Sequence, residues 1–479
     1  MPLTVPIAAD RSILQCIHVE LRQGIALRQS ASGWILCVDG REIEFRLPAG
    51  PASDVFRALQ SEGCSLWDLT RLPEERDRKV TAWSELRKLW TYGWLVQVAS
   101  CGQHDIAVLH NFGDLAFFPP EVLRSTPLQI TEDAFIRRTG NSLVIESVSR
   151  GAMVECLDER LFTLAGLLSK PISLDALSRT LPLPDQVTLS VMAWLLAIGA
   201  VSPAGASVPV TGWSFSDRLM HARTRRGRHT GGYGATFPLR STMPEPPAIR
   251  PSIGDRRIQL HGIDPDDLNR FDGEGSFNSV FERRRSVREH SDAPMTCGEL
   301  SEFLYRVARV TGVAENGPYH IASRPYPSGG ALHELEFYPL VNRCDGLPPG
   351  LYRYDGASHT LELVTGPAPA TRQLLREARE SCLMRGEPHV LMLLAARFAR
   401  VHWKYESIAY ALTLKNVGVA YQTMYLVATA MSLGPCALGG GNADGFARAT
   451  GLDYWEESLV GEFMLGRPAD LSRDTMTKR

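Results

Sequence analysis

The sequence lacks the features that mark membrane proteins, disulfide-rich proteins and strongly charged binding proteins. No apolar run reaches the ~18 residues that a membrane-spanning helix needs; the apolar stretch at residues 389–396, for example, stops at Arg397. The nine cysteines include no Cys-x-x-Cys pair, so we expect no disulfide framework and no metal site. Lys and Arg number 51 and Asp and Glu 53, so the net charge of −2 provides no general field for nucleic acid or an anionic membrane.

The start of the chain also lacks a secretory signal, because its first ten residues have neither a basic region nor a long apolar one. We therefore expect a cytoplasmic protein with reduced thiols. What the chain does have is length and an average globular composition, with 479 residues, 44 % hydrophobic and 22 % charged. Two or three domains are expected at this length.

Residues 1–110 predict a winged helix-turn-helix-like module. Apolar residues alternate over 25–47, as they do in strands, and helical spacing follows at 52–60, 66–72 and 82–90. An apolar pattern typical of strands returns at residues 95–99 and 106–109. Three strands, three helices and a terminal hairpin make up such a module.

Residues 111–210 repeat this order and predict a second winged-helix-like module. Strands are predicted at residues 135–136, 143–148 and 152–156, and helices that start at Glu159, Leu174 and Asp185 follow them. The best local match aligns residues 86–95 with residues 192–201. Each stretch has a helix end, then a glycine where a helix commonly stops, and then a strand.

The composition of the last helix in each module indicates that the modules do not bind DNA. These helices are rich in Trp and Leu, and only Arg87 and Lys88 are basic in the first copy, whereas a DNA reader needs several cations. Two possibilities stay open. One module binds a peptide as an added strand at its meander edge, or the modules only brace the protein as a scaffold.

Residues 211–254 predict an extended linker rich in Pro, Gly and Arg, and residues 255–479 a domain of the α+β class. In that domain we predict helices at residues 277–285, 299–310, 372–379 and 408–433. We predict a mostly antiparallel sheet between the helices, with strands at residues 335–341, 351–354, 389–396 and 462–465.

Four elements of the C-terminal half indicate a ligand site. Arg284 and Arg288 are four residues apart with Ser286 between them, which on a helix gives one face able to grip a phosphate. The run Pro327-Ser328-Gly329-Gly330 predicts a turn whose backbone lies flat against a planar ligand. The remaining two are the glycines 439–441, which we place after the long apolar helix with N–H groups free for an acceptor, and Arg467 after the last strand.

Together these elements resemble the FMN-dependent nitroreductase superfamily, and more closely its SagB/ThcOx-type branch of azoline dehydrogenases, the cyanobactin-oxidase-like enzymes. The resemblance covers roughly residues 213–468. It is carried most specifically by residues 215–229, 284–288, 324–332, 346–354, 403–405 and 466–468.

The resemblance implies an FMN-binding homodimer with two shared sites. Cofactor-binding roles would fall to Arg284, Ser286, Arg288, Gly439, Gly440 and Arg467, and to Pro327, Ser328 and Gly329 from the partner subunit. Lys404 and Tyr405 match the Lys-Tyr pair that is the branch's catalytic signature. The substrate would be an azoline-containing precursor peptide, and a cyclodehydratase is a candidate partner. The first module is similar to ribosomal-peptide-recognition modules, and whether it binds the precursor's leader stays open.

The chain departs from the branch at two places, which puts the substrate side of the pocket in question. It has His333-Glu334 where Tyr-Pro is usual, and Asn416-Val-Gly-Val where Glu-Ala-Gly-His is common. Flavin binding is not affected by either departure.

Oxidation of an azoline to an azole removes a proton from one ring carbon and a hydride from its neighbour, so a base must act beside a hydride acceptor. Tyr405 becomes a base when a nearby cation such as Lys404 favours its phenolate, and Lys404 itself becomes one when burial lowers its pKa. The sequence does not separate these two roles.

Two other functions stay open. A nitro- or quinone reductase would draw electrons from NAD(P)H, and the absence of a Gly-x-Gly-x-x-Gly fingerprint does not exclude it, because simple nitroreductases bind the nicotinamide over the flavin. A flavin-sensing winged-helix regulator is weakened by the scarcity of cations on the last helices.

Overall fold

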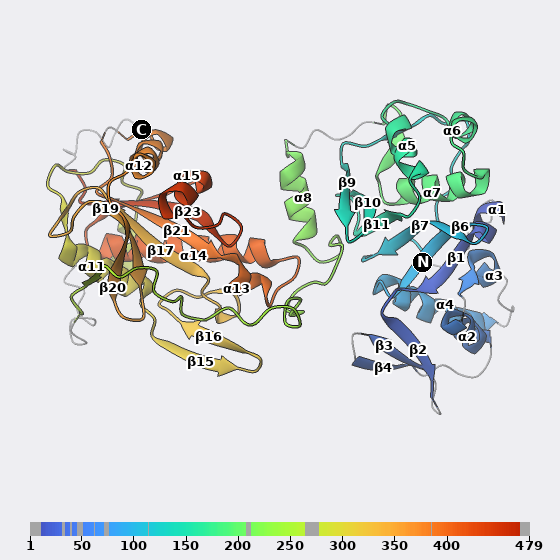
Figure 1. Cartoon of the computed structure of the whole chain (residues 1–479), viewed down its shortest axis with the longest axis horizontal. Helices are drawn as coiled ribbons and strands as arrows, with labels where there is room; N and C mark the ends of the chain where they lie inside the picture. The colour runs from blue at the N-terminus through green and yellow to red at the C-terminus, as the bar shows by residue number, and fades with distance from the viewer. Residues whose placement is uncertain are drawn as a thin grey trace. The chain divides into compact units, whose positions relative to one another are not determined.

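The computed structural model describes residues 11–30, 34–38, 41–45, 51–61, 63–70, 76–113, 115–206, 212–263, 277–384 and 386–469. These residues form two compact units, Met1–Tyr233 and Gly234–Arg479. Figure 1 shows the first unit in blue to green and the second in green to red. The boundary between the units falls inside the predicted linker 211–254.

The first unit is built on a seven-stranded sheet with the order β5-β1-β6-β7-β11-β10-β9. The strands of this unit are β1 (Ile17–Leu21), β2 (Ile25–Gln29), β3 (Trp34–Val38), β4 (Arg41–Phe45), β5 (Cys64–Ser65), β6 (Leu95–Cys101), β7 (His104–Asn111), β8 (Leu128–Ile130), β9 (Ala134–Thr139), β10 (Ser142–Ser147), β11 (Ala152–Cys156) and β12 (Val201–Pro203). Its helices are α1 (Arg11–Cys16), α2 (Pro51–Ser61), α3 (Leu66–Thr70), α4 (Arg76–Thr91), α5 (Arg160–Leu167), α6 (Leu174–Thr180), α7 (Asp185–Ala197) and α8 (Phe215–Arg223).

The sheet joins the two predicted modules, because β7 of the first copy pairs with β11 of the second. Their last helices bury the same core: Trp90 and Trp194 are 1 % and 0 % exposed, and the Trp194 indole donates to Gln97 of the first copy. Gly93 and Gly199 end α4 and α7 with φ values of 69° and 75°, in agreement with the helix-stop reading. The winged-helix character of each module stays a prediction.

The predicted linker is not extended throughout, since α8 occupies residues 215–223. The Ser214 side chain accepts from the Asp217 N–H and so starts this helix, and Arg223 near its end pairs with the buried carboxylate of Glu146 at 2.9 Å. The basic cluster of this segment is therefore anchored in the first unit at Arg223.

The second unit is an antiparallel seven-stranded sheet with helices packed against it (Figure 1). The sheet order is β13-β20-β19-β17-β21-β23-β22. Its strands and those of two small ribbons are β13 (Arg257–Gln259), β14 (Met295–Thr296), β15 (Gly312–Asn316), β16 (Tyr319–Ser323), β17 (Leu335–Val341), β18 (Cys344–Asp345), β19 (Gly350–Asp355), β20 (Thr360–Thr365), β21 (Val390–Arg397), β22 (Gly434–Leu438) and β23 (Glu457–Gly466). The helices are α10 (Phe277–Arg283), α11 (Cys297–Ala308), α12 (Pro369–Ser381), α13 (Phe398–His402), α14 (Ala409–Ala430) and α15 (Ala443–Thr450), with a 3-10 turn at Gly329–Ala331.

The central strands β17 and β21 are buried along their whole length. Helices α11 and α14 pack on one another and share a core with the sheet, and α12 and α15 pack on one another in a second core. The sequence predicted this α+β class and the mostly antiparallel sheet. No helix among the described residues is both long and apolar enough to cross a membrane.

Candidate functional site

Lys404 and Tyr405 follow helix α13 and lie in a small apolar cluster of the second unit. Lys404 is 7 % exposed. Its Nζ donates to the hydroxyl of Tyr319 and lies 4.1 Å from the centroid of the Tyr319 ring and 5.1 Å from that of the Tyr405 ring. The indole of Trp403 donates to the backbone of Met243 at 2.9 Å, which helps to fix the segment. The ammonium of Lys404 is thus held between two tyrosine rings.

The predicted glycine turn lies directly against this pair. Gly330 has φ +65°, a conformation that favours glycine. A Cβ at Gly330 would be 2.6 Å from the Tyr405 hydroxyl and 2.8 Å from Lys404 Nζ. The turn and the pair therefore meet within a single chain, and a side chain at Gly330 would require Tyr405 or Lys404 to move.

A hydrogen-bond network holds the turn from its other side. The N–H of Gly329 donates to Asn416 Oδ1 at 3.0 Å, and the Asn416 amide donates to Glu334 Oε1 at 2.8 Å. The Ser328 hydroxyl donates to Glu334 Oε2 at 3.2 Å. Glu334 is 0 % exposed, and burial raises the pKa of its carboxyl. The two departures from the branch pattern, at residues 333–334 and 416, thus touch one another behind the turn.

The structure corrects the geometry predicted for the arginine motif. Helix α10 ends at Arg283, so Arg284 and Arg288 do not share a helical face. The Ser286 hydroxyl is instead 2.8 Å from that of Tyr425 on α14, and the Arg284 guanidinium lies 5.3 Å from the Tyr425 ring. Arg288 is exposed to solvent. The motif therefore runs as an irregular segment beside α14.

This segment joins the end of the sheet where Arg467 leaves it. The N–H of Val287 donates to Pro435 of the edge strand β22, and the N–H of Ser291 donates to the carbonyl of Arg467 at 2.9 Å. The side chain of Arg467 pairs with Glu299 at 3.0 Å and is 37 % exposed. Arg284, Ser286, Arg288 and Arg467 are therefore carried by neighbouring backbone segments.

Gly439 and Gly440 lie away from these cations, because a strand rather than the long helix precedes them. Strand β22 begins at Gly434, next to the arginine segment, and Gly439 is five residues further on, roughly 16 Å along an extended chain. Both glycines are exposed, and a Cβ on either would meet nothing within 4 Å. The structure does not bring them to the phosphate cations.

The cations and the turn contact two points on α14. Tyr425 touches the arginine segment and Asn416 touches the turn. These two residues are nine positions apart, or roughly 13 Å along the helix axis. Nine positions are two and a half turns, so the two side chains leave opposite faces of α14, and the helix contacts each part of the predicted site with a different face.

Two histidines, His290 half-buried and His389 buried, lie beside the arginine segment. His290 lies 3.1 Å from the carbonyl of Gly434 through Nε2, and burial together with the neighbouring His389 lowers its pKa to about 4. His389 Nε2 is 2.9 Å from the carbonyl of Ser291, and burial lowers its pKa as well. The sequence analysis singled out neither residue.

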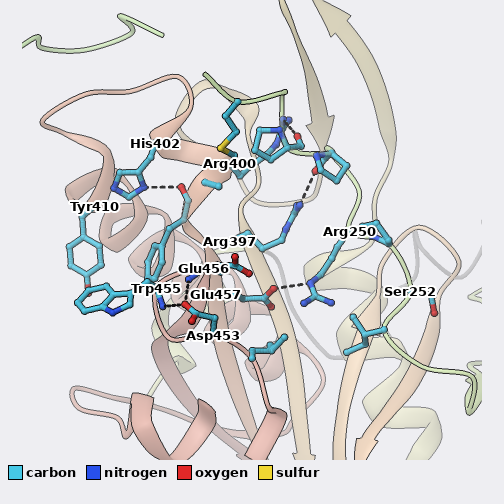
Figure 2. A pocket seen from close by; sticks show the side chains of 18 residues that line it. Arg250, Ser252, Arg397, Arg400, His402, Tyr410, Asp453, Trp455, Glu456 and Glu457 are labelled. Carbon is cyan, nitrogen blue, oxygen red and sulfur yellow. Dashed lines mark hydrogen bonds and ion pairs between the residues drawn. The ribbon is translucent and has the colours of Figure 1, made fainter. Parts of the chain in front are cut away.

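A cavity of about 930 Å³ lies beside α13 and contains none of the predicted site residues (Figure 2). Its rim carries Trp455, which is 80 % exposed, and Tyr410. The arginines that line it are neutralised by carboxylates: Arg250 by Glu457 at 2.8 Å, Arg397 by Glu336 at 2.9 Å and Arg400 by Glu245 at 2.6 Å. With its cations paired in this way, the cavity does not form a phosphate site.

The sequence analysis missed Tyr319 and did not assign Glu334 or Asn416 to the site. Tyr319 starts the second strand of the β15–β16 hairpin, which Asn316-Gly317 signals, with Gly317 at φ +64°. Glu334 and Asn416 stood out only as departures from a pattern. Their contact depends on the packing of α14 against the turn, which spacing along the chain does not reveal.

Two family models match the chain. The Nitroreductase family model matches residues 281–467, which include the arginine segment, the turn, the Lys-Tyr pair and Arg467. The model for the cyanobactin oxidase ThcOx matches residues 129–230 in the first unit.

Two curated relatives are similar to parts of the chain. MJ1384 of Methanocaldococcus jannaschii, named as a nitroreductase, is 29 % identical over 160 residues, 33 % of this chain and 76 % of that protein. The microcin B17-processing protein McbC of Escherichia coli is 32 % identical over 115 residues, 23 % of this chain and 42 % of McbC.

Among solved structures, a nitroreductase-type protein of Ralstonia eutropha has a TM-score of 0.35 at 22 % identity, covering 48 % of this chain and 96 % of its own. The E. coli microcin synthetase McbBCD complex with truncated pro-MccB17 has a matching chain with a TM-score of 0.34 at 22 % identity. That match covers 49 % of this chain and 82 % of the other.

Proposed function

This chain is a SagB/ThcOx-type member of the nitroreductase superfamily, and from that premise we propose that it oxidises thiazolines or oxazolines in a peptide to thiazoles or oxazoles. The observation that carries the proposal is the contact of Lys404 and Tyr405 with Gly330. A buried ammonium and a phenol beside a flat glycine turn suit proton removal from a planar ring.

FMN is the cofactor of the nitroreductase family. The donor set of this chain fits its phosphate, because Arg284, Ser286, Arg288 and Arg467 supply cations and a hydroxyl on neighbouring segments. The partly exposed turn at Ser328–Gly330 carries no bulky side chain, which suits a flat ring system packed beside it. Gly439 and Gly440 follow β22 away from these cations, and their cofactor-binding role stays a prediction.

FMN supplies a hydride acceptor when it is bound. This chain's own task is to remove the proton from the neighbouring ring carbon. Tyr405 is the group that faces Gly330 through its hydroxyl, and Lys404 places a positive charge over the Tyr405 ring. On this geometry we assign proton removal to Tyr405, with Lys404 as the cation beside it. Dioxygen is the proposed final electron acceptor.

We further propose a homodimer with shared sites, in which one protomer supplies the cations and the other supplies the turn. Since Gly330 touches Lys404 and Tyr405 of its own chain, the pair would come from the same protomer as the turn. Co-expression of a Lys404→Ala chain with an Arg284→Ala/Arg288→Ala chain tests this arrangement. Mixed dimers should regain azoline oxidation at one intact site, whereas each variant alone should have little. Mixed dimers no more active than either variant would contradict the shared site.

The first unit is proposed to recognise the precursor peptide. Strands β2, β3 and β4 form a separate three-stranded sheet whose outer strands leave backbone groups for an added strand. Fluorescence anisotropy of a labelled leader peptide with the full chain measures this binding. Micromolar affinity supports recognition, and no binding leaves the unit as a scaffold.

A second candidate is an NAD(P)H-dependent nitro- or quinone reductase, which the similarity to MJ1384 favours. The two candidates differ in the electron donor. We therefore propose to mix the FMN-loaded protein without oxygen with either NADH or a peptide that carries one thiazoline ring. Flavin bleaching by the peptide, with loss of two hydrogens from the ring by mass spectrometry, supports the dehydrogenase. Rapid bleaching by NADH alone would favour the reductase.

A further inference from the structure

The buried network behind the turn consists of three side chains whose polar atoms satisfy one another. Glu334 and Asn416 are 0 % and 5 % exposed. The carboxylate of Glu334 accepts from the Asn416 amide with one oxygen and from the Ser328 hydroxyl with the other. Ser328 Oγ in turn accepts from the N–H of His333 and from the Asn416 amide, each at 3.1 Å. A buried polar network of this kind stabilises one geometry when every member is paired.

The network acts on two successive residues of the turn. It fixes Ser328 through its hydroxyl and Gly329 through the bond from its N–H to Asn416 Oδ1. The next residue, Gly330, is the one that lies against Tyr405 and Lys404. A displacement of the Glu334–Asn416 hydrogen bond would therefore reach the pair through two peptide units.

We propose, on the basis of the proposed function, that Glu334 and Asn416 are positioning residues which set how closely the turn approaches the hydroxyl of Tyr405. They hold the turn through the hydrogen bond from the Asn416 amide to Glu334 Oε1, 2.8 Å long, which needs a carboxyl opposite an amide. Burial raises the pKa of Glu334, which agrees with a carboxyl that has hydrogen bonds but little solvent.

The carboxyl and the amide can be exchanged between positions 334 and 416 without a change in the size of either side chain. Glu334→Gln places two amides together and leaves one hydrogen bond of the network unmade. Asn416→Asp places two carboxyls together, which forces them to share a proton or to separate. The double variant Glu334→Gln/Asn416→Asp restores one amide donor facing one carboxylate. The introduced amide can donate to the introduced carboxylate, and that carboxylate can still accept from the N–H of Gly329.

The chain contains a matched control for this exchange. Asn342 donates to Glu387 at 3.2 Å in the same unit, but Glu387 is exposed. Asn342 follows the last residue of β17, whereas Glu334 precedes its first, so this pair lies at the other end of the strand. Glu387→Gln/Asn342→Asp and its single variants repeat the same chemical change in solvent. They should leave Tyr405 unaffected.

The experiment measures the carbon-13 NMR signal of the Tyr405 Cζ against pH in the FMN-loaded full chain, assigned by its loss in Tyr405→Phe. Both single variants at 334 and 416 should shift the signal or its titration midpoint, and the double variant should return both towards wild type. Azoline turnover should follow, with a loss of about tenfold in Asn416→Asp that grows as the pH rises and recovers in the double variant. Melting temperatures measured in parallel report folding separately.

An unchanged Tyr405 signal in both folded single variants would overturn the proposal, as would a double variant whose shift is the sum of the two. If Asn416→Asp does not fold, Glu334→Gln and the double variant still decide the question. The NMR signal does not depend on azoline turnover, so a failure of the proposed function is distinguishable from a failure of this inference.

Discussion

The two ends of the candidate site are built in different ways. At the pair end, Lys404 is 7 % exposed and is held between Tyr319 and Tyr405, and the turn is tied to Asn416 and Glu334. At the cation end, Arg288 is exposed and Arg467 is paired with Glu299. The pair end is preorganised by the chain itself, whereas the cation end presents charges that a ligand must gather.

This difference indicates where substitutions should affect chemistry and where they should affect binding. Preorganised groups with buried partners lower a reaction barrier because they need little rearrangement. Exposed cations contribute mainly to the affinity for an anion, and salt weakens that contribution. The predictions below test this division.

The largest effect should come from the pair itself. Lys404→Ala and Tyr405→Phe should each lower azoline oxidation by ~100-fold or more, the range expected for loss of general base catalysis. Both variants should retain FMN, which absorbance of the purified protein measures. Lys415→Ala, an exposed lysine on α14, is the control and should remain active. Loss of flavin from either pair variant would assign the pair a structural role.

The next effect should come from the contact between the turn and the pair. Gly330→Ala places a Cβ 2.6 Å from the Tyr405 hydroxyl, so we expect turnover to fall about tenfold or more. Gly451→Ala is a matched control, because Gly451 has a similar φ of +73° but open space around it. Both should lose about 1 kcal/mol of stability from the backbone conformation. Equal turnover in the two variants would argue against a functional contact.

A smaller effect is expected at the cation end. Arg288→Ala removes a charge-assisted contact of roughly 1.5–3 kcal/mol, so FMN affinity should fall about tenfold or more while turnover at saturating FMN is kept. Equilibrium titration with FMN at several salt concentrations measures this. Arg448→Ala, an exposed arginine on α15, should bind FMN normally. Unchanged affinity in Arg288→Ala would place its side chain outside the phosphate site.

The smallest effect on activity near neutral pH should come from His290, which acts on stability. The unfolded chain binds a proton at this residue with a pKa near 6.5, whereas burial and His389 lower the pKa to about 4 in the folded chain. Stability should therefore fall as the pH drops from about 6.5 to 4, because the unfolded state takes up the proton first. His290→Asn should reduce this pH dependence by about one proton in denaturant titrations. An unaltered slope would mean that His290 is protonated in the folded chain.

Much of the fold follows from the periodicity of the sequence. The strands and helices predicted for residues 25–203 lie within a few residues of those observed, because each has a regular apolar pattern and most are bounded by glycine or proline. The predicted helix at 408–433 is α14 at 409–430, and the strand at 389–396 is β21 at 390–397. The shared sheet of the first unit could not be predicted, since pairing of β7 with β11 depends on contacts distant in sequence.

The candidate site was predictable only in part. Lys404 and Tyr405 were singled out from the resemblance and the turn from its Pro-Ser-Gly-Gly residues, and the structure brings them together. The helical geometry assigned to Arg284 and Arg288 was wrong, because α10 ends one residue before Arg284. The placement of Gly439 and Gly440 directly after the long helix was wrong, because the strand β22, too short to show a recognisable pattern, lies between them. Tyr319 and Glu334 enter the site through packing alone.

The most direct test of the central claim is the anaerobic reaction of the FMN-loaded full chain with a peptide that carries one thiazoline ring. The rate of flavin bleaching in a single turnover is compared for wild type, Tyr405→Phe and Lys415→Ala. Our account predicts bleaching with one thiazole formed per flavin in wild type and Lys415→Ala, and a rate lower by ~100-fold or more in Tyr405→Phe. Equal rates in wild type and Tyr405→Phe, or no thiazole formed by the wild type, would contradict it.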